Sequence, residues 1–300
     1  MSMRTNVPHN RHKGNCARAA GHDKRGPACL SGAMSLTDPV AQLLGQPVRD
    51  AVALSGGDLS TVLRVTLADG RIAIVKQGAT ARAEADMLRA IAATGAPAPV
   101  VLAVGDDLLA MTSCADRGGL SGSSWDSLAG VLARLHGVIG DTYGWPVDHA
   151  FGPVAIPNGR RDDWPTFWAD NRLRCHLPHV AAGLGRRIER LADRLPELLP
   201  AHPPAALLHG DLWGGNVLVA DGAVSALIDP ACYHGDREVD VAMLTLFDRP
   251  PAHFFEALKV ETGWRKRAPI YRLWPLLVHL RLFGDGYRGA VEDALDAHGD

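Results

Sequence analysis

The sequence predicts an α+β protein of two lobes: a small N-terminal lobe with an antiparallel sheet and one main helix, followed by a larger, mainly helical C-terminal lobe. β-rich runs separated by a turn occupy residues 61–76, whereas residues 79–93 and, later, 188–198 carry apolar side chains at helical spacing. The chain has 300 residues, 47% of them hydrophobic, which is enough to bury two substantial cores. We expect the small lobe to span residues 34–113 and the helical lobe residues 114–300.

The first 33 residues differ in composition from the rest of the chain. Lys and Arg outnumber the single acid, Asp23, and no aromatic residue is present. Such a stretch has little to bury, so we expect residues 1–33 to be a disordered basic tail. Gly and Pro interrupt it too often for an amphipathic targeting helix. A further hypothesis is that translation begins at Met34, because the residues that follow it open a capped helix.

Charge and cysteine content exclude several classes of function. The net charge of −2 gives no general reason to bind nucleic acid or an anionic membrane. No apolar stretch approaches the ~20 residues that a spanning helix needs. The 5 cysteines are widely spaced and lack a C-x-x-C pair, so neither a disulfide framework nor a zinc site is indicated. We therefore expect a cytoplasmic protein, monomer or homodimer, whose partners are small molecules or proteins.

The small lobe opens with a glycine pair and a predicted hairpin. Thr61–Leu67 and Arg71–Lys76 are β-rich and are joined by the turn signal Ala68-Asp69-Gly70. Gly56 and Gly57 precede the first strand, where backbone N–H groups could approach the phosphates of a nucleotide. A simple turn is the alternative, because no complete glycine-rich phosphate-binding motif is present.

Lys76 ends its strand on the same face as the apolar residues Ile72 and Ile74, since side chains alternate along a strand. A lysine in line with an apolar face needs an anionic partner. The predicted helix 79–93 offers Glu84, and an ion pair between the two would aim the ammonium group at nucleotide phosphates. The alternative is a lysine at the end of a strand that extends into solvent.

The segment with the most candidate catalytic residues runs from Leu208 to Asn216. Its sequence is Leu-His-Gly-Asp-Leu-Trp-Gly-Gly-Asn, and Asp229 follows it. Asp211 could orient an attacking hydroxyl and accept its proton, while the oxygens of Asn216 and Asp229 suit Mg²⁺. A predicted hairpin over residues 216–228 would return Asp229 beside Asn216. We interpret His209 as a structural clasp of this loop. The alternatives are a polar loop formed by chance and half of a metal-hydrolase site, which no companion His/Asp cluster supports.

Residues 143–168 are rich in Gly, Pro and large aromatic side chains, among them Tyr143, Trp145, Trp164 and Trp168. Aromatic residues on a long loop can line a substrate pocket. They can equally pack down as a satellite core, which is the more common outcome for each residue singly.

Taken together, these segments resemble the fructosamine kinase family, also called ketosamine kinases, within the aminoglycoside phosphotransferase and choline kinase relatives of the protein-kinase fold. The resemblance runs from about Met34 to Tyr287. The His-Gly-Asp motif with Asn five residues after the Asp is common to the whole superfamily, while Trp213-Gly214-Gly215-Asn216 and Pro275-Leu276-Leu277-Val278-His279 narrow it to ketosamine kinases. The other segments that carry it are Leu54–Asp58, Val75-Lys76, Glu84–Leu88, Leu132–His136, Ile228–Ala231, Arg237–Leu244 and Trp274–Gly284.

The resemblance implies a two-lobed, protein-kinase-like fold that forms one catalytic domain, and an ATP-dependent transfer of phosphate to a sugar hydroxyl of a ketosamine, such as a fructosamine or ribulosamine, which promotes deglycation. In that family the counterparts of Lys76 and Glu84 hold the ATP phosphates, that of Asp211 is the catalytic base, and those of Asn216 and Asp229 bind Mg²⁺. Alternatives are an aminoglycoside- or choline-type phosphotransferase and a non-catalytic pseudokinase.

The chain also departs from the family pattern. Asp236 stands where bacterial members carry a histidine, and residues 148–153 differ from the usual Asn-x-x-Ile-Gly stretch, so the acceptor end of the site is expected to differ. The cysteine that some members carry in the glycine-rich loop is missing, and redox control through that loop is not expected.

Overall fold

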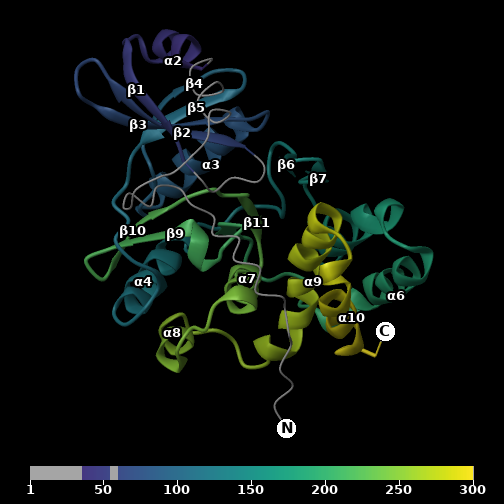
Figure 1. Cartoon of the computed structure of the whole chain (residues 1–300). Coiled ribbons are helices and arrows are strands. Elements are labelled where there is room, and N and C mark those ends of the chain that lie inside the picture. Colours follow the sequence, from purple (N-terminus) through teal and green to yellow (C-terminus); the bar gives the residue numbers. More distant parts are fainter. Residues whose placement is uncertain (1–35, 55–59, 300) are drawn as a thin grey trace. The chain divides into compact units, whose positions relative to one another are not determined.

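The computed structural model describes residues 36–54 and 60–299, which form two compact units. The unit that we call the sheet unit runs to Arg134 and includes Gly214–Pro230 (Figure 1). The helical unit comprises Leu135–Trp213 and the chain from Ala231 onward. The expected tail over residues 1–33, the start at Met34 and the glycine pair lie outside the described residues.

The sheet unit extends beyond the lobe predicted for residues 34–113 because two later segments are hydrogen-bonded together within it. The backbone N–H of Arg117 donates to the carbonyl of Val219 at 2.7 Å. The N–H of Val224 donates to the Ser127 hydroxyl at 2.9 Å, which ties the helix α4 (Ser124–His136) to the hairpin that follows Asn216. The lobe boundaries themselves stay a prediction.

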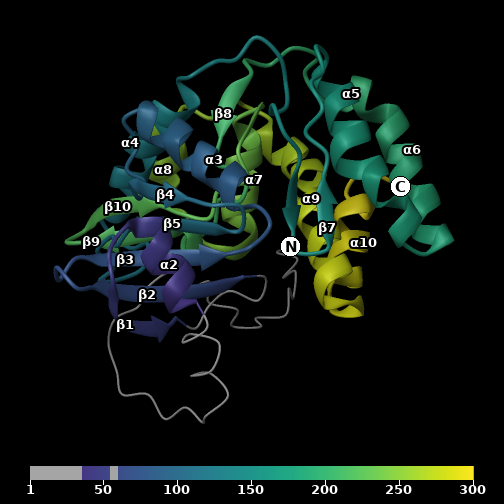
Figure 2. The same cartoon turned by 90° about the horizontal axis from the view of Figure 1, so that it is seen from above.

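An antiparallel five-stranded sheet with the order β1-β2-β3-β5-β4 forms the centre of the sheet unit, and Figure 2 shows the strands side by side in this order. The hairpin predicted at residues 61–76 is confirmed, since β2 and β3 pair from Thr61↔Gln77 to Thr66↔Ile72. The elements of this unit are α2 (Thr37–Leu44), β1 (Val48–Ala53), β2 (Thr61–Leu67), β3 (Ile72–Gln77), α3 (Ala81–Ala93), β4 (Val101–Val104), β5 (Leu108–Thr112), α4 (Ser124–His136), whose last two residues belong to the helical unit, η3 (Gly214–Asn216), β9 (Val217–Ala220) and β10 (Ala223–Leu227).

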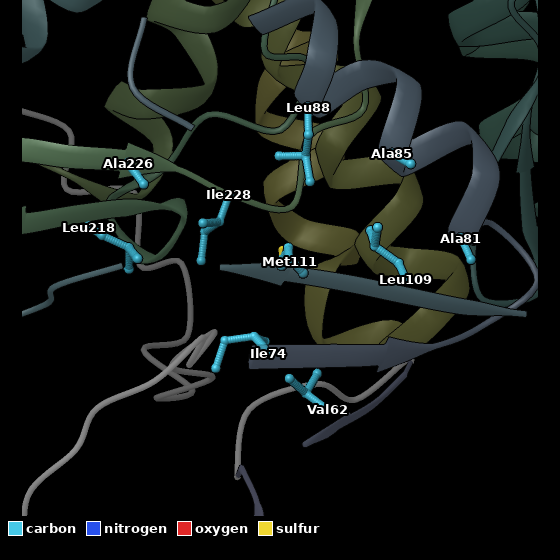
Figure 3. Close-up of a cluster of buried hydrophobic side chains, with 10 residues drawn as sticks. All are labelled: Val62, Ile74, Ala81, Ala85, Leu88, Leu109, Met111, Leu218, Ala226 and Ile228. Atoms are coloured by element: carbon cyan, nitrogen blue, oxygen red, sulfur yellow. The ribbon is translucent and has the colours of Figure 1, made fainter. Parts of the chain in front are cut away.

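One buried cluster joins the sheet, α3 and the β9–β10 hairpin, as Figure 3 shows. Burying each large aliphatic side chain contributes about 1.5–3 kcal/mol, so the shared cluster holds these three elements in one arrangement. Its members are Val62, Ile74, Ala81, Ala85, Leu88, Leu109, Met111, Leu218, Ala226 and Ile228. The hairpin is thereby fixed against the strand that carries Lys76 and the helix that carries Glu84.

Helices dominate the other unit, with α9 beside α10 and α6 nearby (Figure 1). Its elements are β6 (His149–Phe151), β7 (Val154–Ile156), α5 (Trp164–Trp168), η1 (Ala169–Leu173), η2 (Arg174–His179), α6 (Ala182–Leu198), β8 (Ala206–Leu208), β11 (Tyr233–Gly235), α7 (Glu238–Phe247), α8 (Ala252–Ala257), α9 (Trp264–Phe283), η4 (Asp285–Tyr287) and α10 (Arg288–Asp296). Among the described residues, none of the helices is both long and apolar enough to cross a membrane.

The aromatic residues of the long loop were expected either to line a pocket or to pack in a satellite core, and they differ in burial. Trp164 and Trp168 are completely buried, and Tyr143 is nearly so, which makes them core residues. Trp164 Nε1 also donates a hydrogen bond to the Tyr271 hydroxyl at 3.0 Å. Trp145 is only half-buried and stacks on His234 with ring centroids 6.0 Å apart.

Arg172 fastens part of this loop from within the core. Its guanidinium is fully buried and lies 4.2 Å from the ring centroid of Tyr233 and 5.1 Å from that of Trp274. It donates to the carbonyl of Pro157 at 2.6 Å and to Oδ1 of Asn158 at 2.8 Å. Aromatic faces stabilise a desolvated cation, and loop oxygens accept hydrogen bonds from its two terminal nitrogens. The loop backbone is therefore held at residues 157 and 158.

Asp236, the departure from the family pattern, is a buried carboxylate at the start of α7. It accepts a hydrogen bond from the Tyr271 hydroxyl at 2.8 Å and from the backbone N–H of Glu238 at 3.0 Å. Burial, followed by the charge of Glu238, raises the pKa of Asp236 from 3.8 to about 6. The fold therefore favours the protonated acid.

We expect the free energy of unfolding to fall by about 2–3 kcal/mol through this group as the pH rises from 4 to 6, because the folded state binds a proton that the unfolded state has already released. Asp236→Asn removes the titration, so urea midpoints measured across this range should lose that slope. Asp293→Asn, on the exposed side of α10, is the matched control and should keep it. An unchanged slope in Asp236→Asn would contradict the assignment.

Candidate active site

Lys76 lies at the centre of the charged groups of the sheet unit. Its Nζ donates to Oε1 and Oε2 of Glu84 at 2.7 and 2.8 Å, which confirms the predicted ion pair. It also donates to Oδ1 of Asp229 at 2.9 Å. The side chains of Lys76 and Glu84 are only 11% and 8% exposed, so this lysine does not extend into solvent.

The two carboxylates keep the lysine charged. Burial alone would lower the pKa of Lys76, but the negative charges of Asp229 and Glu84 outweigh it and raise that pKa above its ordinary value. A buried ammonium group with two carboxylate partners is held in a defined position. Its positive charge is fixed beside Asp229, whose side chain is 36% exposed.

Asn216 and Asp229 flank the open end of the β9–β10 hairpin. Val217 pairs with Leu227, and the backbone N–H of Ile228 donates to the carbonyl of Asn216 at 3.1 Å. The hairpin predicted from the sequence is thus confirmed. Asp229 has a φ of 53°, in the left-handed region that few residues other than glycine adopt. Such strain at a partly exposed, charged position is typical of functional sites.

The donor set at this end fits a hard divalent cation that takes few protein ligands. Asn216 supplies an amide oxygen and Asp229 a carboxylate, and Mg²⁺ completes its shell with waters and phosphate oxygens. In the part of the chain that the structure describes, no group of three or more His, Cys, Asp or Glu could hold a metal ion by itself. The magnesium assignment stays a prediction, as do the roles of Gly56 and Gly57, which lie outside the described residues.

Asp211 lies in the helical unit, on a loop that a buried carboxylate organises. Asp240 is completely buried on α7 and accepts hydrogen bonds from the backbone N–H groups of His209 and Gly210, each at 2.9 Å. Nε2 of His136 lies 2.9 Å from Oδ2 of Asp240, the same oxygen that accepts from His209. The loop that carries Asp211 is therefore pinned to α7 immediately before the candidate base.

The electrostatics of this clasp are favourable despite its burial. Desolvation raises the pKa of Asp240, but the hydrogen bond and charge of His136, the charge of His209 and the N–H of Gly210 more than offset it and hold that pKa below its ordinary value. His209 is itself buried, and its Nδ1 accepts from the N–H of Asp211 at 3.3 Å. This geometry agrees with the interpretation of His209 as a structural residue.

Sequence reasoning gave no role to Asp240 or His136, although both lie in segments that carried the family resemblance. A signal was present, because Asp240 is a carboxylate in a mainly apolar helix, Glu238–Phe247, and such a group needs a partner. The partner was not predictable, since His136 lies 104 residues earlier in the chain.

Gly210 is required where it stands, and we expect Gly210→Ala to destabilise the protein by more than 2 kcal/mol and to abolish most activity. Its φ is +81°, and a Cβ would lie 2.0 Å from the carbonyl oxygen of Ala231. Gly45→Ala is the control for backbone strain alone, because Gly45 has a φ of +64° and nothing within 4 Å of an added Cβ. Urea unfolding measures the stability of both variants. Equal losses of unfolding free energy would show that the contact with Ala231 does not matter.

The geometry of both units can now be compared with known proteins. The family model of fructosamine kinases matches residues 35–298. The chain belongs to the fructosamine kinase family. Two curated relatives bear the name probable ketoamine kinase: one from Synechocystis is 31% identical over 87% of this chain and 95% of its own, and one from Thermus thermophilus is 35% identical over 82% and 93%.

Solved structures support the same family and the wider fold. A structure from Thermobifida fusca that carries the name fructosamine-3-kinase has a TM-score of 0.80 at 32% identity and covers 88% of this chain and 98% of its own. An aminoglycoside phosphotransferase, APH(4)-Ia, has a TM-score of 0.66 at 18% identity and covers 89% and 99%, which shows the fold alone. The protein-kinase-like fold predicted from the sequence is confirmed, and as a member of the fructosamine kinase family the protein is an ATP-dependent phosphotransferase.

Proposed function

We propose that the protein transfers the γ-phosphoryl group of ATP to a sugar hydroxyl of a ketosamine, formed when a sugar such as glucose or ribose reacts with an amine. The family match over residues 35–298 carries this proposal. The names of the relatives from Synechocystis and Thermus thermophilus point to the same class of acceptor. The charged groups of the two units supply the parts that such a transfer requires.

In this proposal the sheet unit binds the nucleotide. Lys76, held by Glu84, donates to phosphate oxygens, and the glycine pair Gly56-Gly57 brings backbone N–H groups to them. Asn216 and Asp229 would hold Mg²⁺, which would supply positive charge to offset that of the phosphates. The bond between Lys76 and Asp229, 2.9 Å long, supports this arrangement because it places the cationic and the cation-binding group side by side.

Asp211 is the proposed base. Phosphoryl transfer needs an oriented hydroxyl and a proton acceptor more than covalent help from the protein. The carboxylate of Asp211 accepts the proton of the sugar hydroxyl as the oxygen of that hydroxyl attacks the γ-phosphorus. Asp240 and His209 fix the backbone on either side of Gly210, so the position of Asp211 is set before the substrate arrives.

An acceptor panel tests the proposal. Purified protein with ATP and MgCl₂ is offered a fructosamine, a ribulosamine, an aminoglycoside and choline, and ADP release is measured together with the phosphorylated product. We expect turnover on the ketosamines to exceed that on the other acceptors. Faster turnover of the aminoglycoside or of choline would refute the ketosamine assignment, and failure to turn over any of the four would refute the proposed activity.

The proposal includes a compartment and an oligomeric state. We place the enzyme in the cytoplasm, where ATP is available, and expect a monomer or a homodimer. Within residues 36–54 and 60–299, Cys114, Cys175 and Cys232 form no disulfide, which agrees with a reducing compartment.

A further inference from the structure

One face of α9 presents three polar side chains in a row. Arg265, Arg272 and His279 are spaced seven residues apart, which brings them to the same side of a helix. The last turns of α7 lie against this face. Arg272 donates through Nε to the carbonyl of Ala242 at 3.3 Å and through a terminal nitrogen to the Thr245 hydroxyl at 2.7 Å.

A third arginine comes just after α7, the helix that packs against α9. Arg249 follows α7 by two residues and is exposed, and one of its terminal nitrogens donates only to the neighbouring carbonyl of Asp248, at 2.9 Å. Arg265 is also exposed, and its guanidinium lies over the ring of Trp264 at 4.9 Å. Arg249, Arg265 and Arg272 are called the arginine cluster below. Within residues 36–54 and 60–299, no member of the cluster forms an ion pair with a carboxylate.

Two other partly buried arginines of the same unit are neutralised. Arg174 contacts three carboxylates, and Arg267 makes a bidentate pair with Glu238 at 2.6 and 2.7 Å. Arg272, by contrast, is half-buried, and its pKa is lowered by burial and then by the charges of Arg249 and Arg265. Like charges held together away from full solvation are unfavourable, and a bound anion would relieve the repulsion.

Two ring contacts within the helical unit link the loop that carries Asp211 to the elements that carry the arginine cluster. The Trp213 and Phe247 rings are 6.0 Å apart, and the Phe247 and His279 rings are 5.5 Å apart. Trp213 follows Asp211 by two residues, and Arg249 follows Phe247 by two, steps that each span at most about 7 Å. An acceptor whose hydroxyl reaches Asp211 can therefore extend over these rings toward the cluster.

We propose that Arg249, Arg265 and Arg272 form a binding site for an anionic group, a carboxylate or a phosphate, carried by the acceptor. Guanidinium groups match both anions through paired N–H donors, and the half-buried Arg272 is already held in place by α7. The proposal rests on the proposed function, because it presupposes an acceptor at Asp211. It narrows the substrate class to ketosamines that bear a negative charge away from the reacting hydroxyl.

Matched acceptors test the site. Two ketosamines are compared, one built on Nα-acetyl-lysine, with a free carboxylate, and one on the neutral Nα-acetyl-lysinamide; a third carries a phosphate ester on the sugar of the lysinamide compound. We expect kcat/KM to favour at least one anionic acceptor by about tenfold over the neutral one. The ratio should fall as salt is added, because Arg249 and Arg265 are exposed.

Arg249→Met and Arg265→Met should each reduce that ratio, and Arg249→Glu should reduce it further. Each ratio compares kcat/KM of one anionic acceptor with that of the neutral acceptor. The ratio that falls in the variants, for the carboxylate or for the phosphate acceptor, identifies the anion that the site binds. Arg288→Met is the control, because Arg288 lies on α10 and pairs with Asp285 at the surface, and its ratio should match that of the unaltered protein. Ratios near one in the unaltered protein, or ratios that the cluster variants leave unchanged, would overturn the anion site. Turnover of the neutral ketosamine decides the proposed function separately.

Discussion

Replacing Asp211 with Asn is expected to lower kcat on a ketosamine by about 10²- to 10⁴-fold, the range over which a positioned base contributes. An asparagine has nearly the same shape but cannot accept the proton of the attacking hydroxyl. The loop around it should persist, because its bonds to Asp240 run through the backbone of His209 and Gly210 rather than through the side chain at position 211.

The measurement is steady-state ADP release at saturating ATP, with urea unfolding as the check on folding. Asp221→Asn is the control, since Asp221 is an exposed residue of the hairpin turn, paired only with the exposed Arg117. We expect it to keep full activity. If the Asp211 variant retained undiminished turnover, another group would have to be the base.

Lys76→Met should have the second large effect, on both activity and stability. It removes the ammonium group that three carboxylate oxygens now contact at 2.7 to 2.9 Å. Glu84 is then left buried without its cation, and breaking a buried pair in this way costs about 3–5 kcal/mol. Loss of a preorganised donor to the phosphates should lower kcat by about 10²- to 10³-fold.

A second variant separates the two effects. Lys76→Met combined with Glu84→Gln removes both charges, so much of the lost stability should return while activity does not. Lys266→Met, at an exposed lysine of α9, controls for the substitution itself. The assignment of Lys76 to the nucleotide is wrong if the single variant keeps its kcat and its KM for ATP.

Much of the sheet unit was predictable because its signals are local. β-rich runs with a turn between them define β2 and β3, and the same pattern after Asn216 defines β9 and β10. Strand alternation put Lys76 on an apolar face, and a helix nearby in sequence could offer only Glu84 near its start. The ion pair of these two followed from local geometry.

Contacts between distant segments were not predictable in the same way. Asp229 was expected to serve a metal ion alone, yet it also bonds Lys76, 153 residues earlier. Three other features also depend on contacts between distant segments. They are the bond between His136 and Asp240, the raised pKa of Asp236 and the arginine cluster without carboxylate partners. Each depends on which elements pack together, and the periodicity of apolar residues in the sequence does not predict that.

The sequence by itself determined the element types, the motif residues Lys76, Glu84, Asp211, Asn216 and Asp229, and the family to which the chain belongs. Only the tertiary structure decided which buried charges are satisfied and by what. The physical reason is that a charge withdrawn from water must find its partner in space. Spacing along the chain can name the candidates, but the packing of α7, α9 and the sheet selects among them.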